Sequence, residues 1–236
     1  MIKLIKPVLV GACAATLSLP VLAEVSGNVA ITSDYRFRGI SQNDQTLAIQ
    51  GGFDFEHEDG FYVGVWASSV DFQITAVDDA TAELDIYAGY GGEFGDTGIG
   101  YDVNILHFAY PNSDAALGYD FTELTVGLSY EIFSFSVSRT SDYFAGSGEA
   151  TYYNLGAEYP VNDDWTLSAS IGQQDVFDND AWGTPNWRDY KLAISGSLGS
   201  VDAEIAYIDT DLSEEECFGG SDWCDATVTF TLSKSL

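Results

Sequence analysis

The sequence is poor in basic residues, histidine and cysteine. Among its 236 residues, 8 are Lys or Arg, 37 are Asp or Glu, 2 are His and 3 are Cys. Nucleic-acid binding needs a basic patch, so this acid excess argues against nucleic acid as a partner and favours attraction of cations. A His-based catalytic site has only His57 and His107 to draw on.

Long apolar runs are also missing beyond the N-terminus. Only Val8–Leu22 approaches the roughly 18 apolar residues that a membrane helix requires. Lys3 and Lys6 precede that run and small residues follow it, which is typical of a secretory signal peptide. We expect residues 1–23 to be the signal peptide and residues 24–236 to be the mature domain, cut after Ala23.

Two other interpretations of the N-terminal stretch are less well supported. A membrane anchor would be continuous, whereas Gly11, Ser18 and Pro20 interrupt the apolar run. A lipoprotein signal would end at Cys13, which only a very short apolar core precedes. Without a second apolar run, a membrane location requires a closed barrel, because lipid cannot satisfy an open sheet edge.

In the stretch Val25–Ile40, every second residue tends to be apolar and those between tend to be polar. Side chains alternate across a strand, so the pattern predicts one long β-strand with two different faces. A membrane-spanning strand needs about 9–11 residues, with lipid on one face and a polar lumen on the other. The apolar face holds Val25, Val29, Ile31, Tyr35 and Phe37, and the polar face holds Ser26, Asn28, Thr32, Asp34, Arg36 and Arg38.

The rest of the chain repeats this alternation. We predict an all-β fold, an antiparallel up-and-down transmembrane β-barrel of about 12 strands. Connections alternate between short and longer ones, as in outer-membrane barrels with short periplasmic turns and long outer loops. The short connections lie near Asp59, Gly91, Glu131, Pro160 and Leu198, and the longer ones near Ser41, Gln73, Tyr110, Ser141, Gln173 and Asp209. The aromatic residues expected to form interfacial girdles are Tyr35, Phe37, Tyr110, Tyr159, Trp165 and Trp187.

Three motifs near the N-terminus carry a family resemblance. They are the runs from Ser33 to Gln42, from Gln50 to Asp54 and from Gly60 to Trp66. The sequence from Glu24 to the C-terminus resembles the TorF-type porin family of proteobacteria, long described as proteins of unknown function. The resemblance implies a small outer-membrane barrel with a channel role, and it brings no catalytic residues.

The C-terminal strand suggests how the barrel is assembled. Phe230, Leu232 and Leu236 recur at even spacing, similar to the signal that barrel-assembly machinery reads, although that signal usually ends in an aromatic residue. We expect the outer membrane of a Gram-negative bacterium as the location, with its lipid and lipopolysaccharide as surroundings. The sequence leaves the oligomeric state open.

Charged residues on the polar faces are candidates for a lumen cluster. One interpretation is a selectivity ring for a porin that passes small cationic or polar solutes, with no cofactor. The other is a set of structural counter-ions that hold a narrow barrel shut. The candidates are Asp34, Arg36, Arg38, Asp54, Glu56, Glu83, Asp85, Asp102, Glu123, Asp202 and Glu204.

Other function classes remain open at this stage. A structural or adhesive barrel would bind through the acidic stretches Asp175–Trp187 and Asp209–Asp225, and Asp178–Asp180 resembles a calcium loop that lacks its glycine and distal Glu. A barrel hydrolase would need His107 with Asp102 or Asp114, and no nucleophile motif accompanies them. A soluble sandwich is disfavoured, because one apolar face recurs without polar cover.

Cys217 and Cys224 lie seven positions apart in the last long loop. An exported protein meets an oxidising compartment, so we predict a disulfide between them. A metal site is the weaker alternative, because no His or further Cys lies near them.

We expect the protein purified from outer membranes to begin at Glu24. N-terminal sequencing and intact mass measure this directly. An Ala23→Trp variant is the control, since a bulky residue at the cut site blocks signal cleavage. A membrane-embedded chain that keeps residues 1–23 would instead indicate an anchor.

Overall fold

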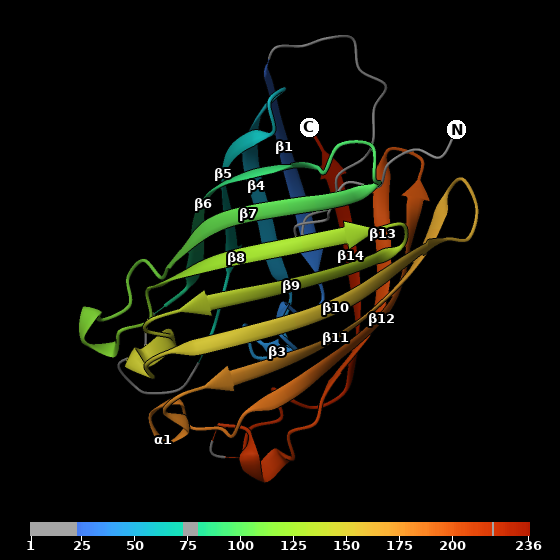
Figure 1. Ribbon diagram of the computed structural model, residues 1–236. Coiled ribbons are helices and arrows are strands. Elements are labelled where there is room, and N and C mark those ends of the chain that lie inside the picture. Colours follow the sequence, from blue (N-terminus) through green and yellow to red (C-terminus); the bar gives the residue numbers. More distant parts are fainter. Residues whose placement is uncertain (1–22, 73–79, 219) are drawn as a thin grey trace.

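The fold is a closed β-barrel (Figure 1). The computed structural model describes residues 23–72, 80–218 and 220–236, so all of the predicted signal peptide except Ala23 and most of the predicted Gln73–Ala80 loop lie outside the described residues. The predicted up-and-down barrel of about 12 strands is confirmed. Its strands are β1 (Ala23–Thr32), β4 (Ala48–His57), β5 (Phe61–Ser69), β6 (Ala82–Glu93), β7 (Ile99–Ala109), β8 (Phe121–Tyr130), β9 (Phe133–Thr140), β10 (Ala150–Pro160), β11 (Trp165–Val176), β12 (Trp187–Leu198), β13 (Val201–Thr210) and β14 (Thr227–Ser235).

Every wall strand pairs antiparallel with its neighbours in sequence. β1 also pairs with β14, from Asn28 opposite Ser235 to Thr32 opposite Thr231, and this pairing closes the sheet. No helix among the described residues is long and apolar enough to cross a membrane.

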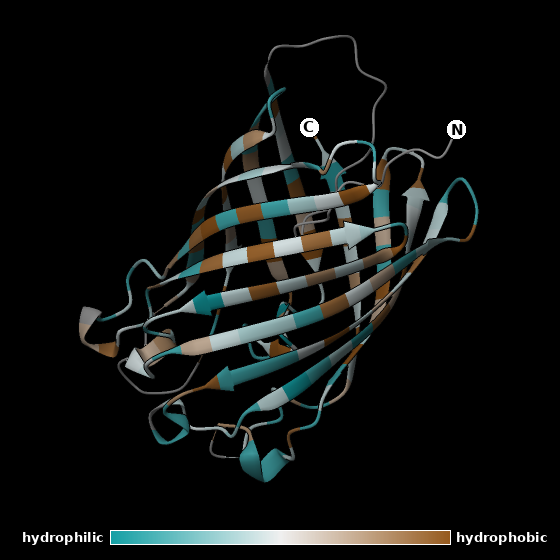
Figure 2. Ribbon diagram, in the orientation of Figure 1, coloured by the Kyte–Doolittle hydropathy of each residue, from teal (hydrophilic) through white to brown (hydrophobic). Residues whose placement is uncertain are grey.

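Apolar and polar residues alternate in bands along the strands (Figure 2), and because side chains alternate between the two faces, this period of two gives the wall an apolar outer face and a polar inner face. On β7, Val103 and Ile105 are exposed on the outside, whereas Asn104 between them is buried inside. The same alternation appears on β8, where Leu124 and Val126 face outward and Glu123 faces inward. An apolar outer belt is what contact with hydrocarbon requires.

The two ends of the barrel differ. Short turns join the strands at one end, which we call the turn end (Figure 1). The longer connections lie at the opposite, loop end, and their described residues contain four single-turn helices: η1 (Ala115–Leu117), η2 (Phe144–Gly146), α1 (Asn179–Trp182) and η3 (Glu214–Glu216). In outer-membrane barrels the longer loops lie outside the cell.

The first strand is shorter than the alternation predicts. β1 ends at Thr32, and residues 33–47, which we call the plug segment, turn into the barrel (Figure 1). There β2 (Arg36–Phe37) pairs with β3 (Ile40–Ser41). Arg38 and Gly39 join them with φ of 50° and 85°, the two positive values of a type I′ turn. Asp34, Arg36 and Arg38 therefore belong to the plug segment and not to the wall.

Aromatic residues fill the loop end of the lumen. Phe72, Tyr110, Tyr119 and Phe144, which we call the aromatic cap, are buried and in mutual ring contact, with centroids 4.3–6.1 Å apart. The girdle prediction is wrong for Tyr35, Phe37, Tyr110 and Trp187, which belong to or pack on this inner core. Tyr35 and Phe37 lie inside the barrel in the plug segment, and Tyr110 and Trp187 are buried, so none of the four can reach lipid.

Inward glycines make room for tyrosines in the turn-end half. A Cβ on Gly64 would lie 2.5 Å from the Tyr87 ring, and one on Gly89 would lie 2.4 Å from the Tyr62 ring. Each tyrosine lies over the glycine of the next strand and donates a hydrogen bond to a carboxylate on the strand beyond it, Tyr62 on β5 to Asp102 on β7 at 2.8 Å and Tyr87 on β6 to Asp54 on β4.

A Gly64→Ala substitution is expected to lower the free energy of unfolding by about 1–3 kcal/mol, since the added methyl overpacks against Tyr87. Gly127→Ala is the matched control, because its Cβ would meet nothing closer than 3.9 Å. Urea unfolding in detergent micelles measures both. Equal stability of the two variants would contradict the close packing of Gly64 against Tyr87.

Candidate functional site

The plug segment crosses the lumen and touches wall strands on many sides. Tyr35 donates a 2.7 Å hydrogen bond to Glu83 on β6 and packs edge-on against Trp66 on β5. Phe37 packs edge-on against Phe108 on β7. On the far side, a Cβ on Gly39 would lie 2.5 Å from Thr210 on β13, so the tip of the hairpin reaches the opposite wall.

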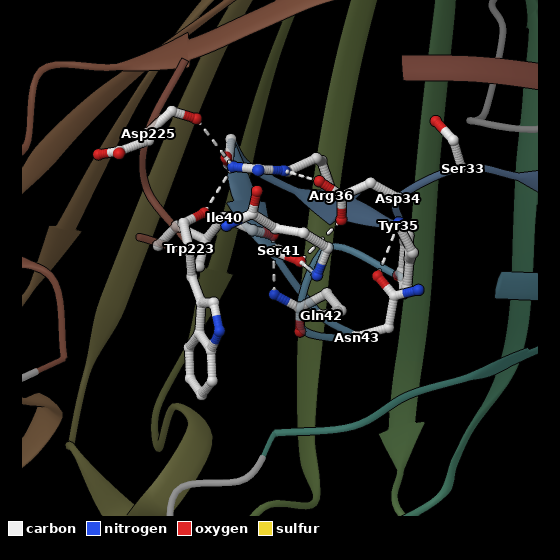
Figure 3. Close-up of polar contacts among 12 residues, drawn as sticks. Ser33, Asp34, Tyr35, Arg36, Ile40, Ser41, Gln42, Asn43, Trp223 and Asp225 are labelled. Atoms are coloured by element: carbon white, nitrogen blue, oxygen red, sulfur yellow. Dashed lines mark hydrogen bonds and ion pairs between the residues drawn. The ribbon is translucent and has the colours of Figure 1, made fainter. Parts of the chain in front are cut away.

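Arg36 fastens the plug segment to the last loop (Figure 3). Its guanidinium pairs with Asp34 at 2.5 Å and donates to the carbonyl oxygens of Gly39, Trp223 and Asp225 at 3.0, 2.5 and 3.1 Å. Asp34 also accepts a 2.7 Å bond from the Ser41 hydroxyl. Because the Arg36 side chain is only 2 % exposed, this pair has little access to solvent.

The loop that receives Arg36 is cross-linked. The predicted Cys217–Cys224 disulfide is present, with the Cα atoms 5.9 Å apart and both residues buried. Trp223, next to the disulfide, donates from its indole to Asp44 of the plug segment at 2.8 Å. The cross-link therefore holds the carbonyl oxygens of the last loop near Arg36.

Arg38 inserts into a site formed by three wall strands. Its guanidinium donates to Glu123 on β8 at 2.5 Å and to Gln174 on β11 at 2.6 Å. It also lies 4.2 Å from the ring centre of Tyr152 on β10, within cation–π range. The Arg38 and Glu123 side chains are 7 % and 4 % exposed. Trp187 fixes the backbone here by donating to the Arg38 carbonyl oxygen at 2.9 Å.

Glu83 lies beneath the plug segment and accepts two phenol hydrogen bonds, each 2.7 Å long, from Tyr35 and Tyr110. Burial, reinforced by the Glu83 charge, raises the pKa of both phenols, so they stay protonated and keep donating. Asp85 follows on the same face of β6 and is 7 % exposed. Its Oδ1 atom is buried without a hydrogen-bond partner.

The turn-end half of the lumen is polar and keeps contact with water. Lys191 pairs with Glu204 at 2.8 Å, and their side chains are 35 % and 30 % exposed. Asp202 accepts a 2.6 Å bond from Ser197, and Glu56 is exposed. By contrast, inward residues of the loop-end half, such as Gln174 and Trp187, are fully buried. The lumen is thus accessible in its turn-end half and filled in its loop-end half.

The structure divides the predicted lumen residues into three groups. In the first group Asp34 and Arg36 fasten the plug segment. In the second, Arg38 of the plug segment pairs with Glu123, which lies near Asp85 and Glu83 of the wall. The third group lines the turn-end half and forms no single ladder of charges with Arg36 and Arg38. It consists of Asp54, Glu56, Asp102, Asp202 and Glu204. The residues predicted from the sequence do not include Gln174, Tyr152 and Asp189. The one signal for them is their position on the inward-facing side of the alternation in their strands.

The geometry does not bring together the residues of the other function classes. His107 lies on the outer face and bonds to Thr122 at 2.9 Å, whereas Asp102 faces inward. In the described ranges, no three His, Cys, Asp or Glu side chains gather in a way that could hold a metal ion.

Residues 17–236 match the model of a family described as bacterial protein of unknown function, Gcw_chp. The chain belongs to this family. Comparison with curated proteins gives no match.

Solved outer-membrane channels share the fold. The "KdgM porin" superposes with a TM-score of 0.54 at 7 % identity, covering 89 % of this chain and 97 % of that one. The "NanC porin" gives 0.53 at 10 % identity, covering 89 % and 98 %. An outer membrane channel from Pseudomonas putida F1 gives 0.52 at 10 % identity, covering 92 % and 96 %.

This likeness shows the barrel fold alone. The barrel agrees with the fold that the resemblance to TorF-type proteins implies, although the matched family does not carry that name. The three solved structures are described as two porins and one outer membrane channel. Identities this low carry the fold and leave the solute undetermined.

An Arg36→Ala variant is expected to loosen the plug segment. Breaking a buried pair and leaving its partner unpaired costs about 3–5 kcal/mol, so peptides covering residues 33–47 should exchange amide hydrogens much faster. Hydrogen exchange followed by mass spectrometry measures this.

Arg139→Ala provides the matched control. Arg139 pairs with Glu149 on the outside, where both side chains are more than half exposed. Losing an exposed pair costs about 1 kcal/mol or less, so exchange in residues 33–47 should not change. If Arg36→Ala also left that exchange unchanged, Arg36 would not hold the plug segment.

Proposed function

We propose that the protein is a porin-like channel for passive diffusion of small cationic or polar solutes, and that the plug segment closes it. Its assignment as a TorF-type porin is part of the proposal. The observation that carries it is the charge of the lumen wall. Among the described wall strands, Lys191 is the one inward-facing basic residue, and Glu204 neutralises it.

Carboxylates dominate the same inner surface. Rings of acidic side chains favour cations in a pore, because they attract positive solutes and repel negative ones. The carboxylates stand at successive levels from the turn end to the plug segment. They are Asp202, Glu204, Asp54, Asp102, Asp189, Glu123, Asp85 and Glu83.

A likeness of fold does not carry over the solute of a neighbour. A KdgM structure with a TM-score of 0.55 and 6 % identity is described as a complex with oligogalacturonate, an acidic oligosaccharide. Here the inward basic groups Arg36, Arg38 and Lys191 each pair with a carboxylate. We infer that this lumen disfavours such polyanions.

Conduction requires the plug segment to leave the loop-end half. The aromatic cap and the arginine pairs fill that half, so a solute entering from the turn end reaches Glu123 and Asp85 and stops there. The filled loop end favours a second candidate, a non-conducting structural or adhesive barrel that acts through its outer loops. Conductance separates the two.

Export and assembly complete the proposal. We propose that the chain reaches the outer membrane through a cleaved signal peptide and inserts with the help of barrel-assembly machinery. The exposed outward residues Phe230 and Leu232 on β14 support reading of the last strand by that machinery. Lipopolysaccharide would surround the loop-end half of the wall.

Removing the plug segment is expected to give a cation-selective channel that conducts far more than the wild-type chain, because the aromatic cap, which lies outside residues 33–47, loses its packing against Tyr35 and Phe37. Thr32 pairs with Ala48, so a short glycine-containing turn can replace residues 33–47 without moving β1 or β4. In planar bilayers the wild-type chain should stay mostly closed, whereas the shortened chain should conduct steadily with potassium preferred over chloride.

A Glu83→Gln and Glu123→Gln double substitution in the shortened chain tests the source of selectivity. It should lower the potassium-to-chloride permeability ratio several-fold, while Ser136→Ala on the same inner surface should leave the ratio unchanged. A folded but silent shortened chain would support the structural barrel and contradict the channel.

A further inference from the structure

We infer that the pocket holding Arg38 is a binding site for small guanidinium compounds, occupied in this closed state by the chain's own arginine. This deepens the proposed function, on which it rests, by naming a solute class. It is carried by the contacts of the Arg38 head group: its hydrogen-bond acceptors and the Tyr152 ring come from three different wall strands, and the plug segment adds the Phe37 ring, 4.6 Å from the guanidinium.

The pocket matches the shape and charge of a planar guanidinium. Glu123 and Gln174 accept from separate terminal nitrogens, Nη2 and Nη1, at 2.5 and 2.6 Å. The Tyr152 ring lies 4.2 Å from the central carbon. A guanidinium presents a planar fork of donors and stacks on an aromatic ring, so it uses both acceptors and the Tyr152 face. An ammonium is a point charge that uses neither feature fully.

A second layer of groups orients the pocket. The Tyr152 hydroxyl donates to the Asp189 carboxylate, 3.0 Å from Oδ2, and accepts from the Asn154 amide at 3.1 Å. Asp189 also attracts Arg38 electrostatically. The wall thus supplies two carboxylates, an amide oxygen and an aromatic face whether or not the plug segment is present.

The backbone conformation of Arg38 indicates that the turn itself does not favour an arginine at this position. Arg38 takes φ of 50° at the first central position of a type I′ turn, where Asn, Asp and Gly are favoured. An arginine pays steric strain at that position. Its contacts with Glu123, Gln174 and Tyr152 explain why an arginine is nevertheless held there.

A solute would reach the pocket from the turn-end half of the lumen, which is accessible to water. Asn154, one inward position below Tyr152 on β10, keeps part of its surface accessible, as does Thr125 below Glu123 on β8. A small solute arriving along this surface would compete with Arg38 for the same acceptors. Displacing Arg38 would remove one wall anchor of the plug segment, which couples solute binding to opening.

The experiment is binding of methylguanidinium to the refolded full mature chain in detergent, measured by titration calorimetry. The main variant is Arg38→Gly, which empties the pocket and suits the positive φ. We expect saturable binding at least tenfold tighter than to the wild-type chain, where Arg38 competes. Adding Glu123→Gln should weaken it at least tenfold, and methylammonium should bind at least tenfold more weakly than methylguanidinium.

Two controls keep the outcome interpretable. Arg139→Ala removes an arginine from an exposed pair that has no aromatic face, and it should create no binding. If Arg38→Gly does not fold, Arg38→Asn tests the same pocket, since Asn is also favoured in this turn. Absent binding to the folded variant, or binding indifferent to Glu123→Gln or to the choice of cation, would overturn the inference.

The binding experiment and the conductance experiment can each fail without the other, so they test the guanidinium site and the channel proposal separately. The calorimetric result requires no ion flow, so a guanidinium site in a silent barrel would keep this inference and end the channel proposal. A cation-selective channel whose Arg38→Gly variant ignores methylguanidinium would do the reverse.

Discussion

The structure depends on closure of its hydrogen-bonded sheet. In hydrocarbon every backbone N–H and C=O must be bonded within the protein, so a wall of strands is stable only when it has no open edge. Pairing of β1 with β14 removes the last edge. Closure also fixes the two environments of the wall. Each strand must then be apolar toward lipid and is free to be polar toward the lumen, which is the alternation that runs through the sequence.

Closure creates an interior in which charge has to be balanced. The wall brings many carboxylates and, among the described strands, the single inward-facing cation Lys191. Buried unpaired charge is costly, so the loop-end half needs positive groups from elsewhere. The plug segment supplies Arg38 to Glu123 from the far side of the barrel. It acts as the electrostatic complement of the wall as well as an obstruction.

Local periodicity was enough to predict the wall. It gave the strand number, the outward faces and the inward direction of Glu83, Asp102 and Glu123, because a period of two depends only on neighbouring residues. It was wrong beyond Thr32, since the plug hairpin is itself extended and continues the same alternation. The turn at Arg38 was hidden because an arginine stands where Asn or Gly would signal a hairpin. Pairing of Arg38 with Glu123, 85 positions away, is set by barrel closure and has no local signal.

Wall and plug segment are held by different forces, and this difference permits one to move without the other. Neighbouring wall strands share long ladders of backbone bonds, which cannot be broken in lipid without a large cost. Outside its own hairpin, the plug segment joins other parts of the chain through few backbone bonds, such as Ser41 N–H to the Trp223 carbonyl at 3.0 Å and Asp71 N–H to the Gln42 carbonyl at 2.9 Å. Its remaining attachments are side-chain hydrogen bonds, buried ion pairs and ring contacts. A buried ion pair adds little net stability, because the attraction mainly offsets the loss of hydration. Water and cations entering a polar lumen restore that hydration, so release of the plug segment is opposed chiefly by the apolar surface of the aromatic cap and by the cross-linked loop that holds Arg36.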